Sequence, residues 1–254
     1  MIRYKEKNLN GLDFKSIVDF KRYLDKNANS ENQKSIYRTG DWSGTRTWSE
    51  FEKYLQNGNN ADIAEIKKYT KIYTDKLEHK FAMKSEYLFD VTGEFFDIGA
   101  VMTGEPEAWV KEIKVKDDKF IELYIQGTYP DGTDLDKVRK NASKLMAIVN
   151  LLQERKFLVK INIVFRTRKS YTSDLKLKTE VKMVVKDYDQ PIDFKKLATL
   201  LGVPFFRRGI LRLLEIEYGN NVRTGYGIPE LKSNEINLFK TEDIDKLEKT
   251  LKEE

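Results

Sequence analysis

The sequence predicts an α/β protein, a three-layer sandwich around a mixed sheet, which follows a helical N-terminal region. Three observations lead to this prediction. Apolar residues recur at helical spacing up to about residue 80, segments with strand composition begin near residue 81, and strands then alternate with strong helices. Such alternation is typical of a sheet that packs against helices. We therefore expect a helical region over residues 1–80 and an α/β domain over residues 81–254.

Three amphipathic helices are expected in the N-terminal region. The first spans residues 12–25, where apolar side chains share one side. The second begins at a capping box formed by Thr47 and Glu50, and Gly58 follows it as a stop. The third spans residues 61–79. Together these segments make the first part of the chain mostly helical.

The second region is expected to alternate strands with helices. Residues 131–156 form the strongest helical pattern in the chain, with acidic residues in its first turn. A helix over residues 193–219 is interrupted near Gly202-Val203-Pro204. The expected strands span residues 84–90, 108–115, 120–129, 158–168, 175–187 and 234–239, and a last helix begins at Thr241.

One of these strands, residues 175–187, alternates between apolar and mainly basic residues. Leu175, Val181 and Met183 face one way, and lysines mainly face the other. A strand with one solvated face is expected near the edge of a sheet.

Composition limits the chemistry that the chain can perform. Hydrophobic residues make up 40% of the chain and charged residues 34%, which is enough for a core beneath a densely charged surface. The net charge of +5 is compatible with nucleic acid as a partner. The absence of cysteine and the single histidine, His79, exclude thiolate and multi-histidine metal sites. Any metal site would use oxygen ligands, which suit Mg²⁺, Mn²⁺ or Ca²⁺.

Carboxylates and glycines cluster directly after the strand that ends at Asp90. Thr92 and Glu94 follow two and four residues later, which places three oxygen ligands in one tight turn. Asp187 closes another strand, and it could reach the same rim, because ligands bind at the carboxyl ends of strands in open α/β sheets. The pattern predicts a Mg²⁺ or Mn²⁺ site or, alternatively, a turn in which carboxylates cap backbone N–H groups.

A resemblance to a known family adds to this interpretation. The segment FDVTGE resembles the opening of a von Willebrand factor A domain, whose metal-ion-dependent adhesion site begins Asp-x-Ser-x-Ser after the first core strand. The resemblance implies a von Willebrand A-like domain in which Asp90 and Thr92 are the first two ligands. Glu94 stands where the family has a serine, and Asp187 or Asp189 would match a later aspartate ligand.

A second resemblance covers two longer segments. WSGTRTWSEFEKYLQNG and FDVTGEFFDIGAVMTGEPEAW are similar to blocks in uncharacterised proteins found largely in bacteriophage genomes, and Gly-Glu-Pro-Glu at residues 104–107 is the most specific part. This resemblance implies a phage or prophage origin, a location in the host cytoplasm or the virion, and phage or host proteins as partners. We assign Asp97, Glu105, Glu107 and Trp109 to partner binding.

Basic residues gather where the strands over 158–168 and 175–187 would meet as a hairpin. If the two strands pair, a row of lysines and arginines could contact a phosphate backbone of DNA or RNA. The alternative is a solubilising surface that prevents edge-to-edge aggregation. The candidate nucleic-acid-binding residues are Arg166, Arg168, Lys169, Lys176, Lys178 and Lys182.

Two classes of function remain open from the sequence. The first is a non-enzymatic binding protein that engages a protein or nucleic-acid partner, with no membrane contact because no apolar run approaches a membrane span. The second is a metal-dependent nuclease of the ribonuclease-H-like type, in which carboxylates from several strands hold metal ions. Asp90, Glu122 and Asp187 would supply those carboxylates.

Overall fold

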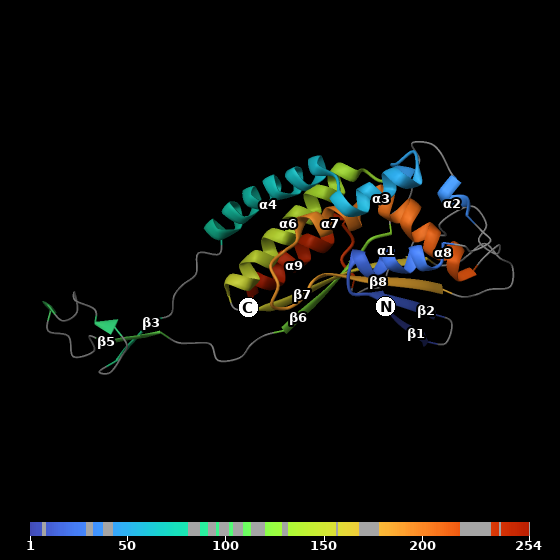
Figure 1. Ribbon diagram of the computed structural model, residues 1–254. Helices are drawn as coiled ribbons and strands as arrows, with labels where there is room; N and C mark the ends of the chain where they lie inside the picture. The colour runs from blue at the N-terminus through green and yellow to red at the C-terminus, as the bar shows by residue number, and fades with distance from the viewer. Residues whose placement is uncertain are drawn as a thin grey trace.

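The computed structural model confirms an α/β protein with a mixed sheet (Figure 1). It describes residues 1–6, 9–28, 33–37, 43–80, 87–90, 95–96, 102–103, 109–112, 120–128, 132–155, 157–167, 178–218, 235–238 and 240–253.

The described elements follow one another along the chain as strands, helices and one π-helical segment. The strands are β1 (Ile2–Glu6), β2 (Leu9–Phe14), β3 (Tyr87–Asp90), β4 (Phe95–Phe96), β5 (Trp109–Glu112), β6 (Phe120–Gln126), β7 (Leu158–Thr167) and β8 (Lys178–Lys186). The helices are α1 (Ile17–Lys26), α2 (Lys34–Tyr37), α3 (Trp48–Asn57), α4 (Asn60–Lys80), α6 (Leu135–Glu154), α7 (Phe194–Leu201), the π-helix η2 (Phe205–Ile210), α8 (Leu211–Tyr218) and α9 (Thr241–Glu253).

Five strands form the main sheet in the order β1-β2-β8-β7-β6. β1 pairs with β2 and β7 pairs with β8 in antiparallel fashion, whereas β2–β8 and β6–β7 are parallel. A parallel bridge between Ile125 and Ile236 continues the sheet beyond β6. β3, β5 and β4 form a separate three-stranded sheet. The expected hairpin of the two long strands is therefore present as β7–β8.

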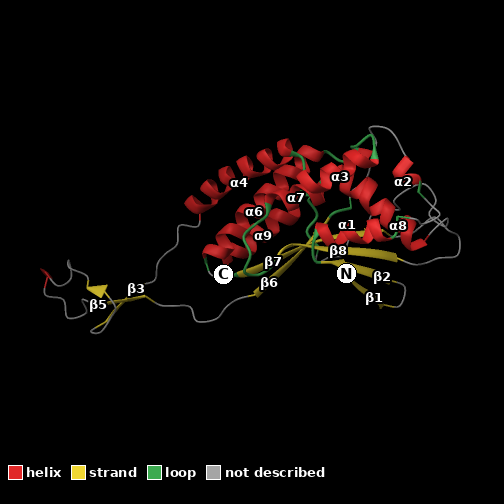
Figure 2. Ribbon diagram, in the orientation of Figure 1, coloured by secondary structure: helices red, strands yellow, loops and turns green. Residues whose placement is uncertain are grey.

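The described helices cover one face of the main sheet, as Figure 2 shows with helices in red and strands in yellow. The face beneath them carries the apolar core, in which Phe14 packs against Phe20 of α1 and Phe165 packs against Phe205 of η2. The opposite face carries polar and charged side chains, including Asp13, Asn162, Arg166, Glu180 and Lys182. The described part therefore has two layers, whereas the expected three-layer sandwich needs helices on both faces.

The N-terminal segment differs from the sequence-based expectation. The helix expected from residue 12 begins at Ile17, and residues 9–14 form β2 instead. β2 pairs with β8, so the regions expected on either side of residue 80 share one sheet. This pairing also places β8 in the middle of the sheet, not at its edge. Alternating lysines fit that position because the face on which they lie carries other polar and charged side chains, including Asp13, Asn162 and Glu180.

The sequence features that predict where α3 begins and ends agree with the structure. Thr47 caps α3 by accepting a hydrogen bond from Glu50 N at 3.1 Å, and the Glu50 carboxylate accepts one from Arg46 N at 2.7 Å. The expected stop at Gly58 is confirmed, since its φ of 69° and ψ of −167° lie outside the range that other residues adopt easily. α4 then begins at once and packs along α6 (Figure 1).

Gly58→Ala is expected to lower the free energy of unfolding by about 2–3 kcal/mol. Two costs contribute: the strain of this backbone conformation for alanine and the steric crowding of the added Cβ. A Cβ at this position would lie 3.0 Å from Ile63 Cδ1 and Thr199 Oγ1. Gly132→Ala is the matched control, since its φ is 76° and no atom lies within 4 Å of the added Cβ. The free energy of unfolding of this control should fall only by the cost of backbone strain, about 1–2 kcal/mol. Urea unfolding measures both variants, and equal losses would remove crowding from this explanation.

Candidate functional site

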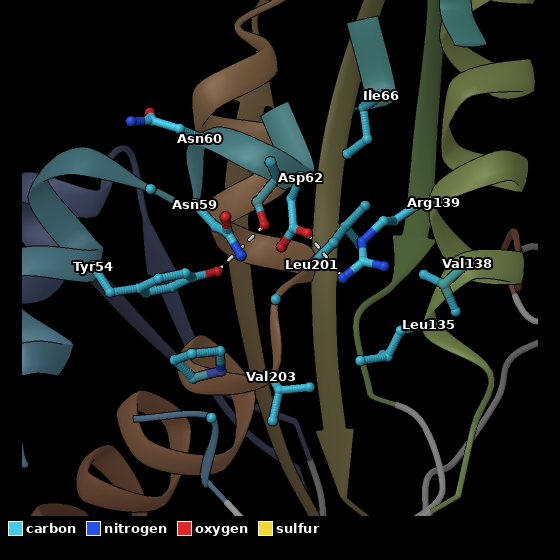
Figure 3. Close-up of a pocket in the computed structure, with 15 residues that line it drawn as sticks. Tyr54, Asn59, Asn60, Asp62, Ile66, Leu135, Val138, Arg139, Leu201 and Val203 are labelled. Carbon is cyan, nitrogen blue, oxygen red and sulfur yellow. Dashed lines mark hydrogen bonds and ion pairs between the residues drawn. The ribbon is translucent and has the colours of Figure 1, made fainter. Parts of the chain in front are cut away.

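A pocket of about 400 Å³ opens in the helical layer, where three breaks in helical structure meet (Figure 3). One wall comes from the turn between α3 and α4, the second from the first turns of α6, and the third from the bend between α7 and η2. Ligand pockets in proteins commonly have about this volume. The lining residues are Gly44, Tyr54, Gly58, Asn59, Asn60, Asp62, Ile66, Leu135, Val138, Arg139, Ala198, Leu201, Gly202, Val203 and Pro204.

The bend at Gly202 fixes the shape of the third wall. The Tyr54 hydroxyl donates to the Thr199 carbonyl at 2.8 Å, which joins α3 to the end of α7. A Cβ on Gly202 would lie 1.9 Å from the Tyr54 hydroxyl oxygen, so this contact requires glycine. Pro204 then starts η2 with φ of −60°, as the proline ring demands. The bend at Gly202 and the hydrogen bond from Tyr54 to Thr199 together hold this wall in place.

Most of the pocket wall is apolar. Ile66, Val138, Ala198 and Leu201 are buried beneath it and belong to the hydrophobic core. Their positions on α4, α6 and α7 mean that elements far apart in the sequence supply the floor. A rigid apolar floor of this kind can take up the hydrocarbon part of a ligand.

The polar part of the pocket centres on Asp62. An Asp62 carboxylate oxygen lies 2.8 Å from Arg139 Nη2, and Figure 3 shows the two side chains pointing toward each other. Arg139 also contacts Asp136 at 2.5 Å and Glu65 at 3.9 Å, so three carboxylates share one guanidinium. Burial raises the pKa of Asp62 above its ordinary value of 3.8, and Glu65 adds to the rise while Arg139 and Asn59 oppose it.

The raised pKa of Asp62 predicts a pH dependence of stability. The folded protein keeps the Asp62 proton at pH values where the unfolded chain has lost it, so ionisation costs stability as the pH rises from 3.8 through the folded pKa. The unfolding free energy of the wild type minus that of Asp62→Asn should therefore fall across this range. Urea titrations of both proteins at several pH values measure this difference. A difference that stays flat or rises with pH would contradict the raised pKa.

A second polar cluster lies on the sheet face opposite the helices, and it contains Arg166. The side chain of Arg166 is 3% exposed, and its Nε lies 2.7 Å from Glu180 Oε2 while Nη1 lies 2.5 Å from Glu235 Oε1. Tyr4 donates to the same Glu180 carboxylate. Arg166 is thus a buried residue that is paired with two carboxylates, and its assignment to nucleic-acid binding stays a prediction.

Lys182 lies on the same face in a partly buried position. Its Nζ is 3.7 Å from Asp13 Oδ2 and 5.5 Å from the centre of the Tyr124 ring. Burial and a hydrogen bond to Glu122 raise the pKa of Tyr124 to about 12. Lys178 begins β8 and pairs with Leu9 in the sheet. Arg168, Lys169 and Lys176 lie outside the described residues.

Of the expected metal ligands, the structure describes Asp90 and Asp187, and it places them at the ends of strands in different sheets. Asp90 ends β3 in the three-stranded sheet, where it pairs with Trp109 of β5, whereas Asp187 follows β8 of the main sheet. Asp187 Oδ1 accepts a hydrogen bond from Tyr188 N at 3.0 Å. Glu122, the third carboxylate of the nuclease hypothesis, lies in β6. Thr92, Glu94, Asp97, Glu105 and Glu107 fall outside the described residues.

Two features are absent from the described part of the chain: a cluster of metal ligands and a membrane-spanning helix. Within the ranges given above, no three histidine, aspartate or glutamate side chains gather closely enough to hold a metal ion. Among the helices in those ranges, none is long and apolar enough to cross a membrane.

Sequence reasoning missed the pocket, although it identified two of the features that form it. The stop at Gly58 and the interruption at Gly202-Val203-Pro204 were both expected. What the sequence does not reveal is that these two breaks and Arg139 line the same pocket. Asp62 and Glu65 lie three residues apart on one side of α4. This pair is the only local feature of the sequence that indicates charged groups near the pocket.

The fold and the pocket define an α/β protein with a ligand-sized pocket in its helical layer. The chain belongs to a family described as a domain of unknown function (DUF7192), whose model matches residues 5–251. The match spans the main sheet and the pocket, so both belong to the family domain. A search of curated proteins found no match, and a search of solved structures found none either.

Proposed function

We propose that this chain is a non-enzymatic binding protein that holds its ligand in the pocket of the helical layer. The observation that carries the proposal is the combination of a cavity of about 400 Å³, an apolar floor and one ion pair, Asp62–Arg139, at the cavity wall. Binding sites for small ligands usually combine apolar walls with a few fixed polar groups. A perturbed pKa within such a cavity strengthens the proposal.

The polar groups of the pocket support binding over catalysis. The Tyr54 hydroxyl donates to the Thr199 carbonyl, and Asp62 pairs with Arg139, so these interactions also fix the position of the walls. Such groups orient a ligand without having to move a proton. The nuclease alternative would draw on Asp90, Glu122 and Asp187, which lie in or follow strands of two different sheets.

A nucleic-acid partner has less support than a ligand in the pocket. The β7–β8 hairpin would supply the contact, but Arg166 is paired with Glu180 and Glu235. Lys182 lies beside Asp13, which offsets part of its charge. Phosphate contacts require basic side chains that face solvent.

The proposal is tested with 1-hexanol as a neutral apolar probe and methyl NMR as the readout. We expect the probe to shift methyl signals of Ile66, Val138 and Leu201, because these side chains form the floor. Val203→Phe places a larger side chain in the pocket and should abolish these shifts. Val18→Phe is the matched control, since Val18 is 64% exposed and lies outside the pocket. Shifts that survive in Val203→Phe would contradict the proposed site.

A further inference from the structure

We infer that the ligand of this pocket carries a cationic group, a primary ammonium or a guanidinium, that binds the carboxylate of Asp62. The inference rests on the proposed function and names the class of ligand for the same site. The hydrocarbon part of the ligand would lie on the floor formed by Ile66, Val138 and Leu201.

The charge around the pocket favours a cation. Arg139 also lines the pocket and is close to three carboxylates, those of Asp62, Asp136 and Glu65, so Asp62 shares its cation with two carboxylates that lie outside the pocket lining. Lys195, whose side-chain stem lies beside Gly58, is exposed to solvent, and water screens its charge. A bound cation would add to the partial compensation that Asp62 receives from the shared Arg139.

The position of Asp62 also fits a cation. Its side chain is 15% exposed, so a ligand in the pocket can reach it while most water is excluded. A carboxylate offers about four acceptor positions. Arg139 and Asn59 are the donors that the structure places on Asp62, which leaves capacity for an ammonium or guanidinium group. The rise in its pKa is what a carboxylate with incomplete compensation shows.

Two sources share this chemistry. A free aliphatic amine offers an ammonium group on a hydrocarbon chain. A lysine side chain of a partner protein offers the same group on a four-carbon stem, which packs on apolar surfaces while its charge meets a carboxylate. The experiment must therefore compare free and peptide-borne amines.

The test compares three probes with the same six-carbon chain: hexylammonium, 1-hexanol and hexanoate. Dissociation constants come from the shifts of the Ile66, Val138 and Leu201 methyl signals at neutral pH, where the amine is protonated. We expect hexylammonium to bind about tenfold more tightly than 1-hexanol, and hexanoate to bind most weakly. Asp62→Asn should remove the preference for hexylammonium. Glu65→Gln should keep it, because Glu65 carries the same charge but does not line the pocket.

Each outcome separates the inference from the proposed function. Equal binding of hexylammonium and 1-hexanol at the pocket methyls would overturn the cationic ligand and leave the pocket as a binding site. No shift with any probe would overturn both. The comparison among probes uses the wild-type protein, so it stands even if Asp62→Asn does not fold. A further comparison uses an acetylated Ala-Lys-Ala amide, with the same peptide carrying norleucine in place of lysine as its control. If the lysine peptide binds more tightly than the free amine, the ligand is a protein partner. If the free amine binds more tightly, the ligand is a small molecule.

Discussion

Replacing Arg166 with methionine is expected to lower the free energy of unfolding by about 3–5 kcal/mol. The substitution keeps much of the side-chain volume but removes the cation that Glu180 and Glu235 share. Both carboxylates are almost fully buried, and Tyr4 donates to only one of them. Two buried carboxylates without their cation must either remain charged at high cost or take up protons. Urea unfolding followed by circular dichroism measures the loss.

Arg22→Met is the control for this prediction, because Arg22 is 74% exposed and pairs only with Asp19 in the described structure. Its loss should stay within about 0.5–1 kcal/mol. If Arg166→Met were as stable as the control and instead lost affinity for nucleic acid, the surface role expected from the sequence would replace the structural role assigned to Arg166.

Replacing Arg208 with methionine is the second large effect, with an expected loss of about 3 kcal/mol or more. Arg208 is 1% exposed and lies in η2. Its guanidinium donates to the carbonyls of Ser35 and Thr45 at 2.7 Å and 2.6 Å, and to the Ser43 hydroxyl at 2.6 Å. It therefore ties α2 and the segment before α3 to the core. Without it, all three acceptors lose this donor, and each of the two on buried residues, Ser35 and Ser43, can cost about 1–3 kcal/mol.

Hydrogen exchange distinguishes this local anchor from a general loss of stability. Amides of residues 43–45, next to the wall at Gly44, should exchange faster in Arg208→Met than global unfolding alone explains. Arg46→Met is the control, since Arg46 is exposed and close in sequence to the same segment. Uniform acceleration across the core, with no excess at residues 43–45, would contradict the anchoring role.

Much of the helical layer could be predicted from the sequence, because its determinants are local. The capping box at Thr47 and Glu50, the stop at Gly58 and the apolar stripe of α6 each act within a few residues. The antiparallel hairpin of β7 and β8 was also accessible, since both strands show strand composition and lie close in sequence.

The N-terminal strands could not be predicted in the same way. β2 is short, and its partner β8 lies more than 160 residues further along the chain. Leu12 and Phe14 alternate over too few residues to be distinguished from the first turn of a helix that begins at Ile17. The absence of a third layer from the described residues has a related cause. Alternating lysines show that one face is polar, but sequence alone does not show whether that strand is central or at an edge.

The pocket is the least predictable feature because no segment contains it. Gly58, Arg139 and Gly202 come from three distant parts of the chain, and each has an ordinary local role as a stop, a helix residue and a bend. The sequence pattern instead indicates a site at Asp90 and the carboxylates after it, because these residues lie close together along the chain. Most of those residues lie outside the described part of the structure, so their roles stay predictions.

The most direct test of the binding function is to measure nuclear Overhauser effects between bound hexylammonium and the protein. We expect contacts from the hydrocarbon chain of the probe to the methyl groups of Ile66, Val138 and Leu201, with the ammonium end nearest to Asp62. Contacts only to exposed apolar side chains such as Ile2 and Phe120, which are 57% and 64% exposed, would contradict it. That result would mean that the probe adheres to the surface and that the pocket does not bind it.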